Sequence, residues 1–261
     1  MIPAQRRGRI LDVVRSLGGA SIEHLAERLG ASPSTVRRDL HFLTAQGYLE
    51  RSHGGATVKT LPRTTFEPDR EIGSIVAHGA KVAIGAMAAS MVENGQSVIF
   101  DSSSTVLEAA KWVGERELEI TAVTNDLEIG THFAKSTHVR LVMLGGTLRP
   151  RSFTLTGDPG LGFLEGINVD LALMGIHSLA GFRLSETSTE VAAMKRCMIA
   201  AARRTILLVD SSKFEVPAFT RVCEVTEVDQ VISDDGIPAE AVRELKGLGV
   251  PVALARIGGS R

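Results

Sequence analysis

The stretch SPSTVRRDLHFLTAQG, residues 32–47, has the pattern of a single helix, and the fold of the segments around it is predicted from this helix outward. It opens with a serine, a typical N-cap, followed by a proline suited to the first helical position, and it ends on glycine. Val36, Leu40 and Leu43 recur at the spacing of one helical face. We therefore predict an amphipathic helix that buries this face.

The other face of this helix carries basic and hydroxyl side chains. At about 100° per residue, four side chains lie opposite the buried face and a fifth lies toward its flank: Ser34, Arg37, Arg38 and His41, then Thr35. The planar guanidinium of arginine bonds guanine O6 and N7 together, or clamps a phosphate. Asp39 borders the buried face, where we expect it to orient an arginine, because a carboxylate repels phosphate.

Two more helical patterns precede this one. Residues 4–17 have an apolar face and stop at a pair of glycines, and residues 21–30 run from a serine N-cap to Gly30. Only a few residues link the second pattern to the third. This arrangement is typical of a helix-turn-helix, whose second helix enters the major groove of DNA with its N-terminal residues on base edges.

A predicted β-hairpin follows in YLERSHGGATV, residues 48–58. The first strand begins with YL, HGG forms the turn and ATV returns. A hairpin behind a recognition helix is a wing, so residues 1–58 are predicted to be a winged helix-turn-helix DNA-binding domain. Arg51 and His53 then either touch the DNA backbone or minor groove, or are solvated residues of the turn.

The charge distribution agrees with a nucleic-acid-binding front. Residues 1–60 carry nine basic and five acidic side chains, a net charge of +4, whereas residues 61–261 carry 20 basic and 25 acidic side chains, a net charge of −5. A basic front on an acidic body fits a module that binds nucleic acid, joined to a second domain.

Other features of the sequence exclude several protein classes. No weakly charged stretch is long enough to span a bilayer, and the N-terminus lacks the apolar core of a signal peptide, so we expect a cytoplasmic protein without a membrane partner. Cys197 and Cys223 lie far apart without metal-ligand spacing, so neither a disulfide framework nor a metal site is predicted. Dinucleotide, nucleotide and hydrolase motifs are missing, so we predict no cofactor, no catalytic residues and no enzymatic activity.

Past residue 58 the pattern changes. Residues 59–73 contain prolines, scattered charge and little periodicity, and are predicted to be a linker leading into a helix. In residues 74–261 apolar strands alternate with helical patterns. The predicted strands are SVIFD (97–101), ITAVTND (120–126), VRLVMLGG (139–146), DLALMGI (170–176), TILLVD (205–210), QVISDD (230–235) and PVALA (251–255). This alternation predicts an α/β Rossmann-like domain with a mostly parallel, largely buried sheet.

Small and polar residues follow five of these strands, at the edge where ligands of parallel sheets bind. The five loops are Asp101-Ser102-Ser103-Ser104-Thr105, Thr124-Asn125-Asp126, Gly145-Gly146, Gly175-Ile176-His177 and Asp210-Ser211-Ser212-Lys213. Hydroxyl and small side chains leave backbone N–H groups approachable at helix N-termini, which suits a phosphate. Lys213 adds a positive charge, and Asp101 and Asn125 are suited to bonding sugar hydroxyls. As an alternative, serines after a strand are only helix caps.

The motifs of the first domain resemble a known family. The segment ILDVVRSLGGASIEHLAERLGASPSTVRRDLHFLTAQGYLERSHGGA is similar to the N-terminal domain of the DeoR family of bacterial transcriptional regulators. That family carries a similar S-x-x-T-x-R-R-D-L-x-x-L recognition helix and ends the module with R-x-H-G-G-A. The resemblance implies that Ser34, Thr35, Arg37 and Arg38 lie at the DNA. With the outward face and the wing, the DNA-binding candidates are Ser32, Ser34, Thr35, Arg37, Arg38, His41, Arg51 and His53.

The larger domain resembles the sensor domain of the same family in IFDSSST, AVTNDL, VMLGGTLR, TGDPG and ILLVDSSKF. This resemblance implies a fold similar to ribose-5-phosphate isomerases and a phosphorylated sugar as effector. The effector-binding candidates are Asp101, Ser102, Ser103, Ser104, Thr105, Thr124, Asn125, Gly145, Gly146, His177, Lys195 and Lys213. The chain departs from the family in GIHSLAGF, residues 175–182, where many relatives read something like G-A-D-G-I. His177 there replaces an acidic residue, which leaves the identity of the effector open.

These observations predict a transcriptional regulator, expected to be a repressor, of a carbohydrate-catabolism operon. Residues 74–261 would sense the effector and oligomerise. Each operator half-site spans about one groove, so we expect a palindromic double-stranded operator bound by a homodimer or homotetramer. The alternative is an active sugar-phosphate isomerase with an appended DNA-binding domain, for which Asp101 and Asp210 are the candidate general bases.

Overall fold

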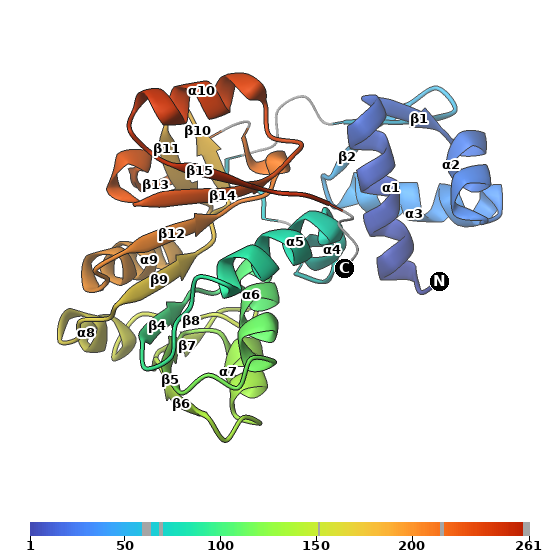
Figure 1. Cartoon of the computed structure of the whole chain (residues 1–261). Coiled ribbons are helices and arrows are strands. Elements are labelled where there is room, and N and C mark those ends of the chain that lie inside the picture. The colour runs from blue at the N-terminus through green and yellow to red at the C-terminus, as the bar shows by residue number, and fades with distance from the viewer. Residues whose placement is uncertain (59–63, 68–69, 151, 215–216, 258–261) are drawn as a thin grey trace. The chain divides into compact units, whose positions relative to one another are not determined.

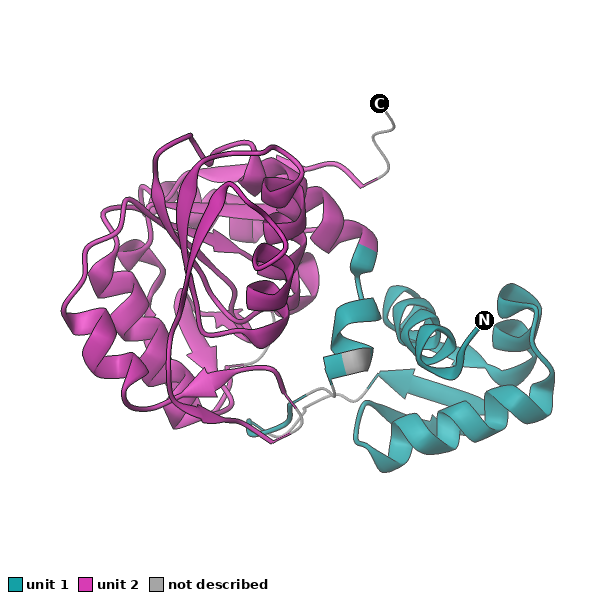
Figure 2. Cartoon of the chain, turned by 90° about the horizontal axis from the view of Figure 1, so that it is seen from below, with its two compact units in different colours: residues 1–78 teal, residues 79–261 magenta. Residues whose placement is uncertain are grey.

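A computed structural model of the chain describes residues 1–58, 64–67, 70–150, 152–214 and 217–257. The chain divides into two units, Met1–His78 and Gly79–Arg261 (Figure 2). One apolar core lies within the first unit, and two apolar clusters lie on the two faces of the sheet of the second.

The first unit contains the three predicted helices and the predicted wing. Its helices are α1 (Pro3–Leu17), α2 (Ile22–Leu29), α3 (Pro33–Ala45) and α4 (Arg70–Ile75), and its strands are β1 (Gly19–Ser21), β2 (Leu49–Ser52) and β3 (Gly55–Val58). Ser21 and Ser32 cap α2 and α3 by accepting backbone N–H groups, and α1 and α2 end at left-handed Gly18 and Gly30. These start and stop residues confirm the sequence-based interpretation.

The strand β1 was not predicted from the sequence, because its three residues carry no periodic pattern. It pairs antiparallel with β3, which also pairs with β2, so the wing is a three-stranded sheet in the order β1-β3-β2. At the start of α2, the backbone N–H of Ile22 donates to the Gly54 carbonyl at 2.8 Å. The helix-turn-helix and the turn of the wing are therefore joined by backbone hydrogen bonds.

The first unit extends beyond the wing, because α4 returns to α1. Ile72 and Val76 are buried in the core that α1, α2 and α3 share, and Gly8 of α1 has no side chain where Ile75 packs. The Ala77 backbone N–H donates to Asp12 at 3.1 Å. The predicted linker 59–73 lies partly outside the described residues, and the part that is described includes the first residues of α4.

The described part of the second unit has a parallel sheet of seven strands, in the order β15-β14-β12-β9-β4-β5-β6 (Figure 1). These strands are β4 (Ser97–Phe100), β5 (Ile120–Thr124), β6 (Val139–Met143), β9 (Leu171–Met174), β12 (Thr205–Leu208), β14 (Gln230–Asp234) and β15 (Val252–Ala255). All neighbouring pairs run parallel, which confirms the predicted sheet. The carboxyl ends of the strands consequently lie along one edge.

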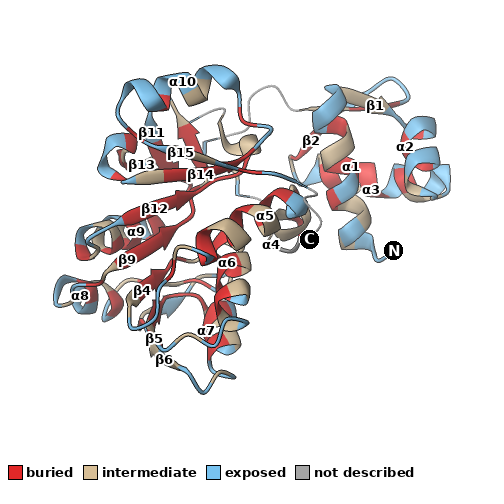
Figure 3. Cartoon of the chain, viewed as in Figure 1, coloured by how far each residue is buried: buried red, intermediate tan, exposed pale blue. Residues whose placement is uncertain are grey.

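Helices cover both faces of this sheet. One face packs against α5 (His78–Ala89), α6 (Ser104–Gly114) and α7 (Leu127–Phe133), and the other against α8 (Gly160–Glu165), α9 (Thr189–Ala201) and α10 (Ala239–Gly247). Phe100 points to the first set and Ile99 to the second, as strand alternation requires. The strands β9 and β12 in the middle of the sheet are buried throughout (Figure 3). None of the described helices is both long and apolar enough to cross a membrane.

Two antiparallel elements of the second unit were not predicted from the sequence. One is the hairpin of β7 (Thr147–Leu148) and β8 (Leu155–Thr156), and the other is the sheet of β10 (Ser178–Ala180), β11 (Arg183–Glu186) and β13 (Thr220–Glu224). Their strands have two to five residues and lie in segments that read as loops, so the sequence carried no usable alternation.

Candidate functional site

The face of α3 that was predicted to be outward is exposed. Val36, Leu40 and Leu43 are fully buried, whereas the side chains opposite them are exposed: Ser34, Arg37, Arg38 and His41. Thr35 is half-buried on the flank. Ser32 accepts the Thr35 backbone N–H at 3.2 Å, so its hydroxyl holds the start of the helix. Arg51 in β2 and His53 in the following turn are also exposed.

Asp39 lies between α3 and α1 and is only 1% exposed. Its two carboxylate oxygens accept the Nε of Arg6 at 2.5 Å and the Nε of Arg7 at 3.0 Å. The guanidinium of Arg7 also stacks over the Phe42 ring, 3.6 Å from its centroid. The expectation that Asp39 orients an arginine is confirmed, but its two arginines belong to α1 rather than to α3.

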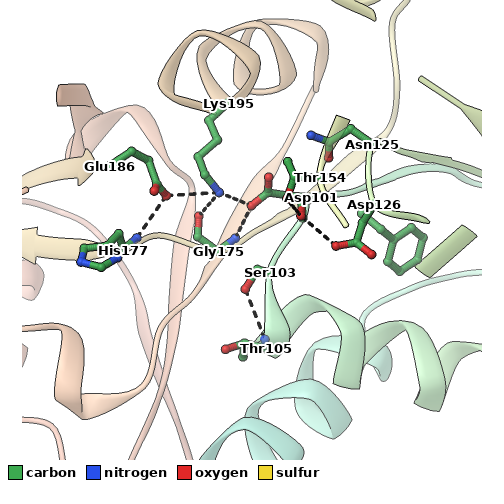
Figure 4. Close-up of polar contacts among 12 residues, drawn as sticks. Asp101, Ser103, Thr105, Asn125, Asp126, Thr154, Gly175, His177, Glu186 and Lys195 are labelled. Atoms are coloured by element: carbon green, nitrogen blue, oxygen red, sulfur yellow. Dashed lines mark hydrogen bonds and ion pairs between the residues drawn. The ribbon is translucent and has the colours of Figure 1, made fainter. Parts of the chain in front are cut away.

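In the second unit, Lys195 of α9 reaches down to the carboxyl ends of β4 and β9 (Figure 4). Its ammonium donates to Asp101 and, at 2.9 Å, to the Gly175 carbonyl, while the Gly175 N–H donates to Asp101 at 3.0 Å. Glu186 of β11 lies 3.5 Å from the same ammonium. Burial by itself lowers the pKa of Lys195, but Asp101 and Glu186 outweigh it and raise the pKa, so the ammonium is charged.

Glu186 is a residue that the sequence analysis missed, because it lies on a strand that was not predicted. Its carboxylate accepts the His177 backbone N–H at 3.1 Å and faces Lys195 (Figure 4). The chain therefore has a carboxylate beside the loop in which His177 replaces the acidic residue of many relatives. His177 itself is half-buried at the end of β9.

A second group of polar residues lies on the other side of Asp101, at the end of β5. The Ser102 hydroxyl donates to Asp126 at 2.7 Å and lies 2.6 Å from the Thr154 hydroxyl. Asn125 is 1% exposed and donates through Nδ2 to the Leu155 carbonyl at 3.0 Å. No donor among the described residues reaches its Oδ1. A buried amide oxygen without a donor is costly unless a ligand or water supplies one.

Other residues predicted to bind the effector make contacts within the protein itself. Thr124 donates to the Phe100 carbonyl at 2.7 Å and accepts the Asp126 N–H at 3.1 Å. Side chains at Gly145 and Gly146 would collide with the protein, since a Cβ would lie 2.7 Å from the Pro159 ring and 2.5 Å from the Thr156 carbonyl, respectively. The two glycines thus allow the hairpin β7–β8 and the start of α8 to pack closely.

A second charged cluster lies at the end of β12. Asp210 is 1% exposed and accepts the Ser212 N–H at 3.1 Å, and Lys213 follows in the same turn. Burial raises the pKa of Asp210, but Lys213, Lys81 and Ser212 outweigh it and hold the pKa below its ordinary value. Lys81 of α5, only 3% exposed, was missed by the sequence analysis, although a lysine in so apolar a helix was a usable signal.

Lys81 lies on the part of α5 that precedes its contact with α6. A Cβ at Gly85, one turn after Lys81, would lie 2.7 Å from the Ala109 nitrogen, and Lys81 itself lies near Asp210 at the end of β12. Ser103 caps α6 by accepting the Thr105 N–H at 3.2 Å, and Ser104 begins the helix. A cation and a helix N-terminus thus lie at the same edge of the sheet.

Comparison with known proteins gives matches for both units. A family model of the DeoR-like helix-turn-helix domain matches residues 6–61, and one of the DeoR C terminal sensor domain matches residues 76–235. The HTH-type transcriptional regulator GlpR of Haloferax volcanii is 33% identical over 254 residues, which cover 97% of this chain and 98% of that protein. A putative aga operon transcriptional repressor of Escherichia coli O157:H7 is 30% identical over 252 residues, covering 96% and 93%. Ribose 5-phosphate isomerase A of Methanocaldococcus jannaschii is similar over 52% of this chain and 54% of that chain, with 18% identity and a TM-score of 0.39.

Proposed function

Because this chain belongs to the DeoR family of transcriptional regulators, we propose that it represses a carbohydrate-catabolism operon and responds to a phosphorylated sugar. In this proposal the chain is a cytoplasmic homodimer or homotetramer, which binds a palindromic operator through one recognition helix per half-site.

The exposed face of α3 supports the DNA-binding role. Arg37 and Arg38 project from the helix that follows the tight turn, and no carboxylate lies on that face, since Asp39 is buried against Arg6 and Arg7. Arginine forks suit both guanine edges and phosphates, and exposed hydroxyls add further contacts. We assign base contacts to Ser34, Arg37 and Arg38, and backbone contacts to the wing.

The observation that carries the effector proposal is the unpartnered Oδ1 of Asn125. It is buried at the edge of the sheet where Lys81 and Lys213 also lie. A sugar hydroxyl would donate to this oxygen. The phosphate would bind at the N-terminus of α6, whose backbone N–H groups and dipole favour an anion, with Lys81 and Lys213 supplying positive charge. Asp210 balances these lysines when no phosphate is bound.

The alternative, a sugar-phosphate isomerase, is not favoured by the contacts of its candidate bases. Asp101 accepts from Lys195 and from the Gly175 N–H, and Asp210 accepts from Ser212. A general base must be within reach of the substrate proton that it removes, and these carboxylates are engaged by the protein. We therefore propose that the site binds its ligand without catalysing a reaction.

The first experiment is a thermal-shift screen of the full chain against sugar phosphates, each matched with its unphosphorylated sugar. A ligand at 100 times its Kd stabilises the native state by about 2.7 kcal/mol, so a phosphorylated effector raises Tm and its matched sugar does not. The hit is then tested for a change in operator affinity, since an effector acts only through its differential affinity for two states. If no sugar phosphate changes Tm, the effector proposal fails. Turnover of ribose 5-phosphate would support the isomerase alternative instead.

Lys213→Ala tests the site itself. We expect unchanged DNA affinity in the absence of effector and loss of the effector response, because the variant removes a charge from the phosphate position alone. Calorimetry that shows undiminished sugar-phosphate binding to this variant would remove Lys213 from the site.

A further inference from the structure

We propose that Arg6 and Arg7 of α1, held against the recognition helix by Asp39, form a binding site for a backbone phosphate of duplex DNA. The inference rests on the DNA-binding role proposed above and extends it to a helix outside the helix-turn-helix and the wing.

The first support is the geometry of the two guanidinium groups. Each turns its Nε toward a different oxygen of the buried Asp39 carboxylate, at 2.5 Å for Arg6 and 3.0 Å for Arg7. Arginine carries five N–H donors, so this arrangement leaves Nη donors of both forks for a further acceptor. One of them, Nη1 of Arg6, makes a long hydrogen bond of 3.4 Å to the Met1 carbonyl. Phosphate oxygens accept from such forks in pairs.

The second support is the charge of the cluster. One carboxylate balances only one of two guanidinium groups, and Arg38, the neighbour of Asp39 in sequence, adds an exposed positive charge. The cluster therefore carries an excess of positive charge when no DNA is bound. Among the described residues, Asp39 is the carboxylate that contacts Arg6 and Arg7, and no second one joins it. A phosphate would neutralise the remaining positive charge.

The third support is the position of the cluster on α3. At about 100° per residue, Phe42 and Thr35 lie between the buried Asp39 and the exposed Arg38 on one flank of the helix. Arg7 stacks on Phe42, which is one turn beyond Arg38. The guanidinium of Arg7 thus borders the face assigned to DNA, and the basic surface continues from α3 onto α1.

The fourth support is preorganisation. The side chains of Arg6 and Arg7 are only 15% and 22% exposed, so the protein already fixes them. A long, free arginine loses rotamer freedom when it binds a phosphate, and these two lose little. Stacking on Phe42 further restricts Arg7.

A purely structural role, in which Asp39 and the arginines only join α1 to α3, makes a different prediction. Loss of an ion pair would then lower stability but leave the number of phosphate contacts unchanged. The salt dependence of DNA binding separates the two roles, because each phosphate contact contributes about 0.9 to the slope of log K against log salt.

The experiment measures binding of the full chain to a mixed-sequence duplex by fluorescence anisotropy between about 50 and 200 mM NaCl. Phosphate contacts are independent of sequence, so the operator need not be known. Arg7→Gln and Arg6→Gln are each expected to reduce the steepness of the fall of log K with log salt by about 0.9. The loss of affinity over this salt range is then about 3.5-fold smaller than in the wild type. Each variant keeps the other arginine on Asp39, which supports the fold.

Two variants serve as controls. Arg15→Gln removes the same charge from an exposed position in the last turn of α1 and is expected to keep the wild-type slope. Asp39→Asn keeps both arginine charges, so it is expected to lower Tm while the slope does not fall. Melting curves of all variants identify those that are folded at the assay temperature.

Folded Arg6→Gln and Arg7→Gln variants with the wild-type slope would overturn the inference. If both variants unfold, NMR of the wild type decides: the Nε–Hε resonances of Arg6 and Arg7 are expected to shift on addition of duplex while that of Arg15 does not. Unshifted Arg6 and Arg7 resonances would overturn the inference equally. A wild-type chain that binds no duplex at all would overturn the DNA-binding role itself, which is a distinguishable result.

Discussion

Lys195 and Asp101, 94 residues apart in sequence, form a buried ion pair that joins α9 to the carboxyl end of β4. The same ammonium donates to the carbonyl of Gly175 at the end of β9, so one side chain connects a helix with two neighbouring strands. Both side chains of the pair are at most 3% exposed. A pair so placed holds the helix and the two strands together and is costly to break.

Lys195→Met should lower the unfolding free energy of the second unit by about 3–5 kcal/mol, because it leaves the Asp101 carboxylate buried without its cation. Trp112, the one tryptophan of the chain, lies in α6 and reports urea unfolding of this unit. Arg203→Met, which breaks an exposed pair with Asp170, should cost at most about 1 kcal/mol. Equal effects of the two substitutions would contradict the structural role of Lys195.

Asp210 should make the second unit sensitive to acid. Its pKa is held below the ordinary value by Lys213 and Lys81, despite burial, so its ionised form stabilises the folded state above the unfolded pKa near 3.8. That contribution is lost as pH falls below this value and through the lower folded pKa. Asp210→Asn should therefore flatten the fall in unfolding free energy as the pH drops below 3.8. An unchanged slope against pH would contradict the depressed pKa.

Ser32 offers a way to separate helix capping from DNA binding. Ser32→Ala removes the acceptor for the Thr35 N–H and should lower the stability of the first unit by about 1 kcal/mol. Ser32→Asp keeps a cap of equal quality but places a negative charge at the end of α3 that is assigned to DNA. It should retain Tm and weaken DNA binding. Undiminished binding by Ser32→Asp would place this end of α3 away from the phosphates.

Arg38→Ala should weaken binding to the operator by about 1–3 kcal/mol and relax discrimination at one base pair. The side chain is exposed, so the fold should be retained. The measurement compares operator and mixed-sequence duplexes at one physiological salt concentration, with Arg15→Ala as the matched control. Equal losses on both duplexes would assign Arg38 to a phosphate instead of a base.

The sequence predicted best those elements whose signals are local. Ser21, Ser32, Gly18 and Gly30 mark helix ends through capping and left-handed backbone, and each is found in that role. The seven strands of the parallel sheet were predictable because apolar runs alternate with helical patterns. The assignment of particular residues to DNA or to an effector stays a prediction.

Some of the elements that were missed depend on partners distant in sequence. Strand β1 exists because β3 pairs with it, and β13 because β11 pairs with it. Glu186 was missed with its strand. Lys81 had a local signal in its apolar helix, but its partner, Asp210, is brought near it by the packing of α5 on the sheet. Pairings of this kind are decided by tertiary packing, which local sequence does not encode.

The backbone bonds between β1 and β3, and between Ile22 and Gly54, have a consequence for how operators of this protein can vary. They join the start of α2 and the strand before it to the wing, so we expect the helix-turn-helix and the wing to bind DNA as one unit with a fixed span between the two parts. Base substitutions within a half-site would then be tolerated one at a time, whereas an inserted base pair between the two contacted stretches would put one of them out of phase with the groove.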